Sequence, residues 1–138
     1  PWRQHNAARL LAGLAKHTPG VLPALREALA EGALLAADAD FERAHIGRYL
    51  RRAAVEGLGE LGETGVADLL PLLDEPDEWD RHHAVVALCK ARSPRAREAL
   101  RGRLGDGCLA TREAAARGLG AIGDAEGAAL AMNDAEPR

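Results

Sequence analysis

Few residues in this sequence could carry out covalent or metal chemistry, and none stands at the spacing that such chemistry needs. His82 and His83 are adjacent, so on a helix their side chains would point about 100° apart and could not chelate one metal. Ser93 is the only serine, and it stands where a helix N-cap is expected rather than beside a base. Cys89 and Cys108 lie outside any CxxC or Cys/His pattern of a metal site. We therefore expect no catalytic residue, no metal, no cofactor and two reduced thiols.

Two runs of like charge are better candidates for binding. The basic run comprises Arg92, Arg95, Arg97, Arg101 and Arg103. The acidic run comprises Asp74, Glu75, Asp77, Glu78 and Asp80. Arg97 and Arg101 would share one helix face, and Trp79, inside the acidic run, either packs on its own helix or is exposed as an anchor. The candidate partner-binding residues are therefore Trp79, Arg95, Arg97 and Arg101.

The overall composition favours one helical domain without a strong net charge. The 138 residues carry a net charge of -3, which gives no basic excess for nucleic acid or an anionic membrane. The charge is unevenly placed, however, since residues 51–80 hold 2 basic and 9 acidic groups and residues 81–120 hold 9 and 3. No membrane span and no signal-peptide pattern is visible, so we expect a cytoplasmic protein that does not bind membranes.

A repeated set of residues predicts the elements that must position these groups. Three sets share the same internal offsets and follow one another at 30 and 31 residues: Arg51, Ala54, Leu58 and Leu61; Arg81, Ala84, Leu88 and Ala91; Arg112, Ala115, Leu119 and Ile122. A weaker copy precedes them as Gln4, Ala7, Leu11 and Leu14. Positions i, i+3, i+7 and i+10 lie on one helical face, so each set predicts an amphipathic helix with its apolar stripe buried.

Each of these helices is followed by a turn signal and a second apolar stretch. The expected N-caps lie at Thr18-Pro19, Thr64-Gly65, Ser93-Pro94 and Gly123-Asp124. A break is expected near Asp38 to Asp40. Because a single helix pair cannot bury its apolar stripe, the pattern predicts an all-α protein, an α-solenoid of about four stacked helix pairs in one domain. The predicted repeats cover residues 2–37, 40–74, 78–105 and 108–132.

Two stretches carry a resemblance to a known family. Residues 50–62 and 111–124, with their Arg, Ala, Leu and Gly positions, resemble the bacterial HEAT-like repeats first grouped with phycobilin lyases. The resemblance implies that Arg51, Arg81 and Arg112 form structural hydrogen bonds across repeats, and that the second helices line a concave surface. The third copy departs from the family, because Arg92-Ser93 stands where the family has Gly-Asp.

These observations lead to three readings of function. We expect a non-catalytic protein-protein interaction module, a scaffold or adaptor, whose concave face binds another protein with an acidic surface. The alternative is a nucleic-acid-binding solenoid that uses the arginine row of the third and fourth repeats on a phosphate backbone. A purely structural spacer is the third reading.

Overall fold

The structure, a computed structural model, describes residues 20–134, with side chains to residue 130. Every regular element in that range is helical, which confirms the all-α class. The elements are α2 (Val21–Ala36), α3 (Phe41–Glu60), α4 (Glu63–Leu69), the 3₁₀ helix η2 (Leu70–Asp74), α5 (Glu78–Ala91), the 3₁₀ turn η3 (Pro94–Ala96), α6 (Arg97–Gly102), α7 (Leu109–Ala121) and α8 (Ala125–Asp134). None of these helices is long and apolar enough to cross a membrane.

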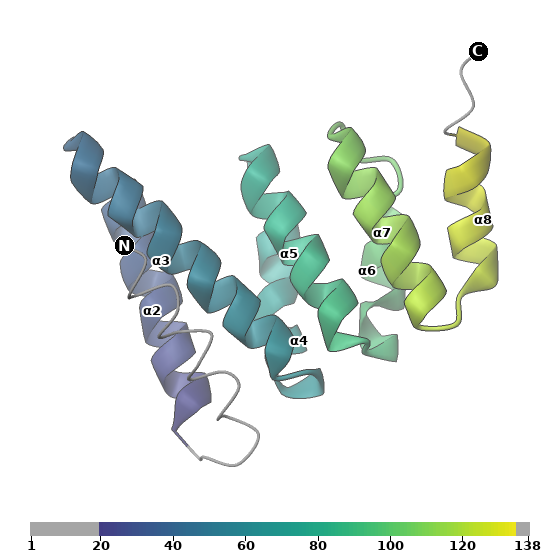
Figure 1. Cartoon of the computed structure of the whole chain (residues 1–138), viewed down its shortest axis with the longest axis horizontal. Helices are drawn as coiled ribbons and strands as arrows, with labels where there is room; N and C mark the ends of the chain where they lie inside the picture. The colour runs from purple at the N-terminus through teal and green to yellow at the C-terminus, as the bar shows by residue number, and fades with distance from the viewer. Residues whose placement is uncertain (1–19, 135–138) are drawn as a thin grey trace.

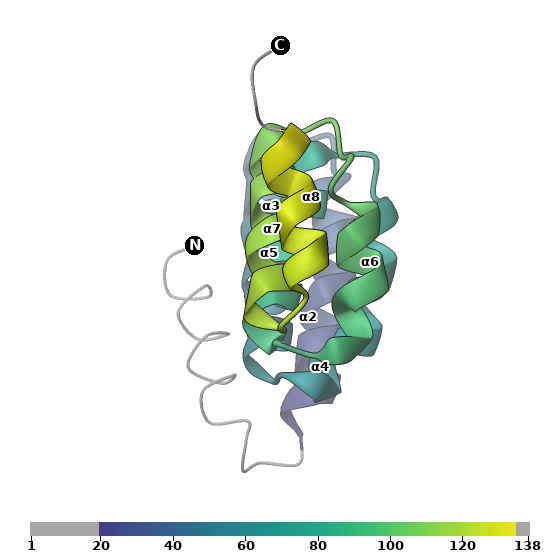
Figure 2. The same cartoon turned by 90° about the vertical axis from the view of Figure 1, so that its right-hand side faces the viewer.

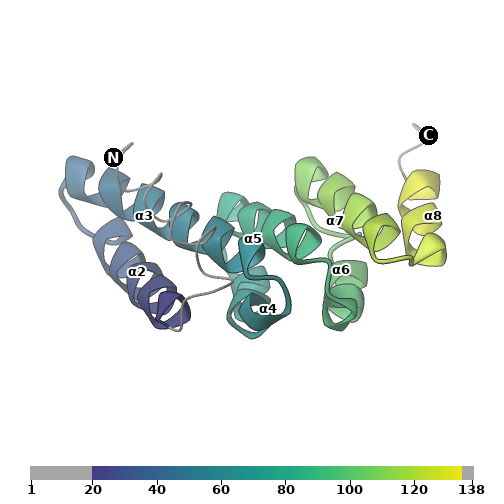
Figure 3. The same cartoon turned by 60° about the horizontal axis from the view of Figure 1, so that its bottom comes forward.

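The helices stack in two rows, as an α-solenoid requires (Figure 1). Helices α3, α5 and α7 form one row, the first-helix row, and α2, α4 and α6 form the other, the second-helix row (Figure 3). Seen along the stack, α3, α5 and α7 superimpose, with α4 and α6 beside them (Figure 2). Each turn of the chain therefore adds one helix to each row and buries the face that its predecessor leaves open.

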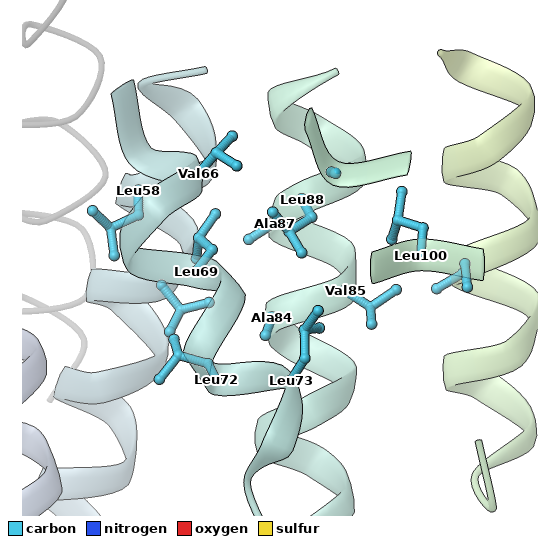
Figure 4. Packing of buried hydrophobic residues seen from close by; sticks show 14 of the residues in the cluster. Leu58, Val66, Leu69, Leu72, Leu73, Ala84, Val85, Ala87, Leu88 and Leu100 are labelled. Carbon is cyan, nitrogen blue, oxygen red and sulfur yellow. The ribbon is translucent and has the colours of Figure 1, made fainter. Parts of the chain in front are cut away.

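One continuous core runs between the two rows. The repeated leucines at the predicted apolar positions, Leu58, Leu88 and Leu119, are fully buried. Residues of the second-helix row, among them Leu69 and Leu100, reach in from the other side (Figure 4). Full burial of each such leucine stabilises the fold by roughly 1.5–3 kcal/mol, so the repeats depend on one another for stability.

The first helix boundary in the described range lies where the sequence predicted a break. Helix α2 ends at Ala36, and α3 begins at Phe41 after the N-cap Asp40, whose carboxylate accepts a hydrogen bond from the Arg43 amide. At 20 residues α3 is longer than α5 with 14 or α7 with 13. Its first turns therefore extend past the repeat, alongside the end of α2.

The second helices are less regular than the sequence pattern predicted. Pro71 stands where α4 gives way to the 3₁₀ helix η2, and Pro94 opens η3 ahead of α6, because proline cannot donate the amide hydrogen bond that continues an α-helix. The prediction of Thr64 as an N-cap was wrong, since α4 already begins at Glu63 after Gly62. Ser93 and Asp124 do cap, accepting hydrogen bonds from the amides of Arg95 and Gly127. The predicted first helix, from Gln4 to Leu14, and the cap at Thr18-Pro19 lie outside the described residues.

Candidate binding groove

Two arginines of the first-helix row form ion pairs with carboxylates that follow them by one repeat or less. Arg51 on α3 contacts the carboxylates of Glu75 and Asp80 at 2.8 and 2.9 Å. Arg81 on α5 makes a two-pronged pair with Asp106, with Nε to Oδ2 at 3.0 Å and Nη2 to Oδ1 at 3.3 Å. Burial pushes the pKa of Asp106 up, but the hydrogen bonds from Arg81 and from the Cys108 amide hold it below its usual range.

Arg81 also fastens the loop that leads into its own helix, and the hydrogen bonds of Arg112 within the described residues are of this kind and not the cross-repeat bond that the resemblance implied. Arg81 Nη1 donates to the carbonyl oxygens of Glu75 and Pro76 at 2.9 and 2.8 Å. Arg112 Nη1 donates to the carbonyls of Asp106 and Gly107 at 2.8 and 3.3 Å, one repeat later. These guanidinium groups thus satisfy backbone acceptors that no helix would satisfy.

Most arginines of the second half of the chain that were candidates for a partner already have carboxylate partners. Arg95 pairs with Glu63 at 3.0 Å. Arg101 makes a two-pronged pair with Asp124, at 2.7 and 2.9 Å. Arg103, which belongs to the same basic run, pairs with Asp74 at 2.9 Å. The basic run is therefore largely neutralised by its own chain, and it does not form the open row of cations that the sequence suggested.

Arg97 differs from the other two candidate arginines. It is half-buried, and its Nε is enclosed without a hydrogen-bond partner among the described residues. It also lies close enough to Asp124 to help lower the pKa of that carboxyl group, which falls to about 2 chiefly through the hydrogen bond from Arg101. Among the described residues, Arg97 is thus the candidate arginine without an ion pair, although its Nε is enclosed and does not face a partner.

The third repeat keeps its polar contacts despite its unusual residues. Arg92 adopts the left-handed backbone conformation, with φ 51°, at the position where Gly62 and Gly123 have φ 65° and 80°. Ser93 bonds to the carboxylate of Glu63, and this bond, with that from Arg95, lowers the pKa of Glu63. The serine therefore replaces the acidic residue that the family has at this point.

The described histidines and the two thiols show no arrangement for chemistry. Burial, with the charges of nearby arginines, lowers the pKa of His82 and of His83. The Cys89 thiol donates to the Ala114 carbonyl at 3.1 Å, and burial raises its pKa to about 11. Over the part of the chain with described side chains, no group of three or more potential ligands could hold a metal ion.

A groove is lined by the end of α2, by α3, and by the start of α5 with the loop before it, where α3 and α5 lean apart (Figure 1). Its volume is about 580 Å³, within the range of ligand and peptide sites of roughly 300–1,000 Å³. We call it the Trp79 groove. It is lined by Ala33, Ala36 and Ala37, by His45, Arg48, Tyr49, Arg51 and Arg52, and by Glu75, Pro76, Asp77, Trp79, Asp80 and His83.

Aromatic side chains gather at this groove although the chain has very few of them. Trp79 is 58% exposed and Tyr49 is 39% exposed, and both line it. Phe41, 76% exposed, stacks on His45 with ring centroids 6.0 Å apart, and His45 in turn meets the edge of Tyr49 at 4.6 Å. All three aromatic residues of the described chain therefore lie exposed on one side of α3 and α5.

Trp79 both packs on its own helix and is exposed; its role as an anchor for a partner stays a prediction. Its indole ring meets the edge of His82, one turn further along α5, at 6.2 Å. More than half of its surface is nevertheless open to solvent. Sequence reasoning selected Trp79 but missed Tyr49, although Tyr49 stands 30 residues earlier and thus at the same position of the preceding repeat.

Comparison with known proteins identifies the repeat. The sequence profile of HEAT repeats matches residues 66–133. The profile of the PBS lyase HEAT-like repeat matches residues 50–75. The two matches together run from the middle of α3 into α8. They include Trp79 and the α5 side of the groove, whereas Tyr49 and the α2 residues of the groove precede them. No curated protein matches the chain.

Proposed function

Because this chain belongs to the HEAT-like repeat family, whose repeats generally mediate protein interactions, we propose that it is a non-catalytic protein-interaction module whose partner docks at the Trp79 groove. The proposal keeps Trp79 as the main contact. It moves the binding site from the arginines of the second-helix row, where the sequence suggested it, to a groove lined mainly by α3 and the start of α5 and partly by the end of α2.

The observation that carries this proposal is the exposure of Trp79 and Tyr49 at one groove. Exposed aromatic rings cost free energy in water, and tryptophan and tyrosine are enriched among the residues that dominate binding energy. Other exposed apolar side chains, such as Val86 and Leu109, line no part of this groove. A partner that fills the groove would therefore bury the exposed rings of Trp79 and Tyr49, and this burial would contribute to its binding energy.

The non-catalytic part of the proposal rests on the family and on the state of the reactive groups. HEAT repeats generally act as scaffolds. The Cys89 thiol is protonated at neutral pH because burial raises its pKa to about 11, and Ser93 is occupied with Glu63. Neither group is poised as a nucleophile.

Pairing of the arginine row weakens the nucleic-acid alternative. A phosphate that approached Arg95 or Arg101 would have to displace the carboxylate of Glu63 or Asp124 from a bond of 3.0 Å or less. No described aromatic side chain lies on the second-helix row to stack a base. Among the described residues, the candidate arginine without an ion pair is Arg97, and it is half-buried, which leaves little positive charge for a polyanion.

The experiment is affinity capture with the whole chain as bait, in halves treated with nuclease or left untreated. The baits are the wild type, Trp79→Ala, Tyr49→Ala and two controls. Leu109→Ala removes a side chain on α7 that is 56% exposed, about as much as Trp79, but lies outside the groove. Arg97→Glu tests the second-helix row; because Arg97 lies near Asp124, the urea midpoint of this variant is recorded to confirm folding.

The proposal expects one protein to be recovered in near-stoichiometric amount, to survive nuclease, and to be lost with Trp79→Ala but kept with Leu109→Ala and Arg97→Glu. Loss with Arg97→Glu and retention with Trp79→Ala would place the partner on the second-helix row instead. Recovery that disappears with nuclease would establish the nucleic-acid reading.

A further inference from the structure

The chemistry of the Trp79 groove indicates what kind of side chain it accepts. Resting on the proposed function, we infer that the groove binds a cationic side chain, arginine or lysine, projecting from a segment of the partner protein. The cation would lie against the ring of Trp79 or Tyr49, with its charge held by the carboxylates of the groove wall.

The two rings come from neighbouring helices and define a slot. Tyr49 on α3 and Trp79 on α5 occupy the same position of consecutive repeats. Both rings line the groove, whose volume of about 580 Å³ can hold a side chain of a partner. Long flexible side chains with an apolar stem fit such a slot, and a cationic head group is attracted to a ring face within about 6 Å.

One wall of the groove is formed by the loop before α5 and by the first turn of α5. On this wall, carboxylates outnumber the guanidinium groups that bond to them. Three carboxylates line it, those of Glu75, Asp77 and Asp80. One guanidinium, that of Arg51, bonds to Glu75 and Asp80 at 2.8 and 2.9 Å. Asp77 accepts two amide hydrogen bonds at the start of α5 and has no cation of its own. On this wall one guanidinium therefore contacts two of the three carboxylates, and the other two arginines that line the groove, Arg48 and Arg52, lie on α3.

Because Asp80 on the same wall is partly buried, an added positive charge would stabilise its ionised form. Burial raises the pKa of Asp80, and repulsion from Asp77 and Glu75 adds to this effect, against the attraction of Arg51. A further cation beside these groups would relieve the repulsion and stabilise the ionised form. An acidic side chain in the same place would add a fourth like charge and is therefore disfavoured.

The opposite wall adds a secondary preference. Arg52 is paired with Glu56 at 3.5 Å, whereas Arg48 is exposed and has no carboxylate partner among the residues whose side chains are described. A partner segment with a carboxylate close to its cation would satisfy Arg48 across the groove. Such a segment would be held by both walls, with the cation as the required element.

Random dodecapeptides displayed on phage provide the probe. They are selected on the folded wild-type chain and counted against parallel selections on Trp79→Ala and on Leu109→Ala. Clones that depend on Trp79 but not on Leu109 report the groove. Synthetic versions of those peptides are then measured by fluorescence polarisation against wild type, Glu75→Gln and Asp80→Asn, with the urea midpoint of each variant recorded to confirm folding.

The inference expects the clones that depend on Trp79 to share an arginine or lysine, and replacement of that residue by alanine to weaken binding about tenfold or more. Glu75→Gln and Asp80→Asn should each weaken these peptides several-fold, and the loss should be larger at low salt. Trp79-dependent clones without a basic residue, or with acidic residues in its place, would overturn this inference and leave the proposed function standing. An absence of any Trp79-dependent clone would contradict both.

Discussion

Gly118 faces Cys89 across the interface between α5 and α7, and its replacement by alanine tests how closely the repeats pack. A Cβ at position 118 would lie 2.2 Å from the Cys89 Sγ and 3.2 Å from both the Cys89 Cβ and the Leu100 Cδ1. The distance from the added Cβ to the Cys89 Sγ is shorter than any contact between non-bonded atoms in proteins. The thiol must therefore rotate, or the two helices must separate. The Sγ also donates to the Ala114 carbonyl at 3.1 Å, and rotation would break that bond.

The expected cost follows from three terms. Forcing an extra methyl group into a packed interface costs about 1–3 kcal/mol. A typical hydrogen bond contributes roughly 0.5–1.5 kcal/mol, and loss of the weaker thiol bond costs part of that amount. The higher helix propensity of alanine offsets about 0.8–1.0 kcal/mol of this. We therefore expect Gly118→Ala to lower the free energy of unfolding by about 1–2 kcal/mol.

Urea unfolding followed by circular dichroism measures this loss, with two matched comparisons. Gly120→Ala lies on the same helix, where the new Cβ would meet nothing closer than 3.9 Å, so it should stabilise the fold by up to about 1 kcal/mol. In a Cys89→Ala background the Sγ is gone, and Gly118→Ala should become nearly neutral. The packing argument is refuted if Gly118→Ala stabilises as Gly120→Ala does, or if its cost is unchanged when Cys89 is alanine.

Three further outcomes follow from the structure. Arg92→Gly should raise the free energy of unfolding by about 1 kcal/mol in urea, because the left-handed conformation strains any side chain but suits glycine; no gain would argue against that backbone. The folded-state pKa of Asp124, about 2, lies below its unfolded value near 3.9, so the pair with Arg101 stabilises the protein fully above about pH 4 and loses this contribution as the pH falls toward 2. Asp124→Asn should therefore destabilise the protein at pH 7 and flatten the dependence of its urea midpoint between pH 4 and pH 2, and an unchanged slope there would contradict the assignment. Iodoacetamide at pH 8 should modify Cys89 more slowly than Cys108 in the folded protein and at an equal rate in urea, since burial raises the Cys89 pKa to about 11; equal rates in both states would show that the interface opens.

The first-helix row was predictable because its signal is local. An apolar stripe with small residues at fixed offsets reports one helix face, and the 30-residue spacing reports the stacking of such helices. Leu58, Leu88 and Leu119 are therefore buried where the pattern put them. The second helices were less predictable because prolines at positions 71 and 94 break them into short pieces, whose boundaries are set by packing and not by propensity.

The candidate site was predictable only in part, because its neighbours are distant in the sequence. Trp79 stood out in the sequence because it is a rare aromatic residue inside the acidic run. Tyr49, the second ring of the groove, comes from α3, 30 residues earlier. The same limit applies to Arg101, which looked free in the sequence but lies against Asp124, 23 positions later. Applying the repeat spacing to aromatic and charged residues, and not only to apolar ones, would have found Tyr49.

The most direct test of the central claim is the dissociation constant of the captured partner for wild type, Trp79→Ala and Leu109→Ala. The account predicts that Trp79→Ala weakens binding by roughly 30-fold or more, as expected when a dominant aromatic contact of about 2 kcal/mol is removed. Leu109→Ala should stay within about twofold of wild type. Equal losses for the two variants, or a loss with Leu109→Ala alone, would contradict the claim that the partner docks at the Trp79 groove.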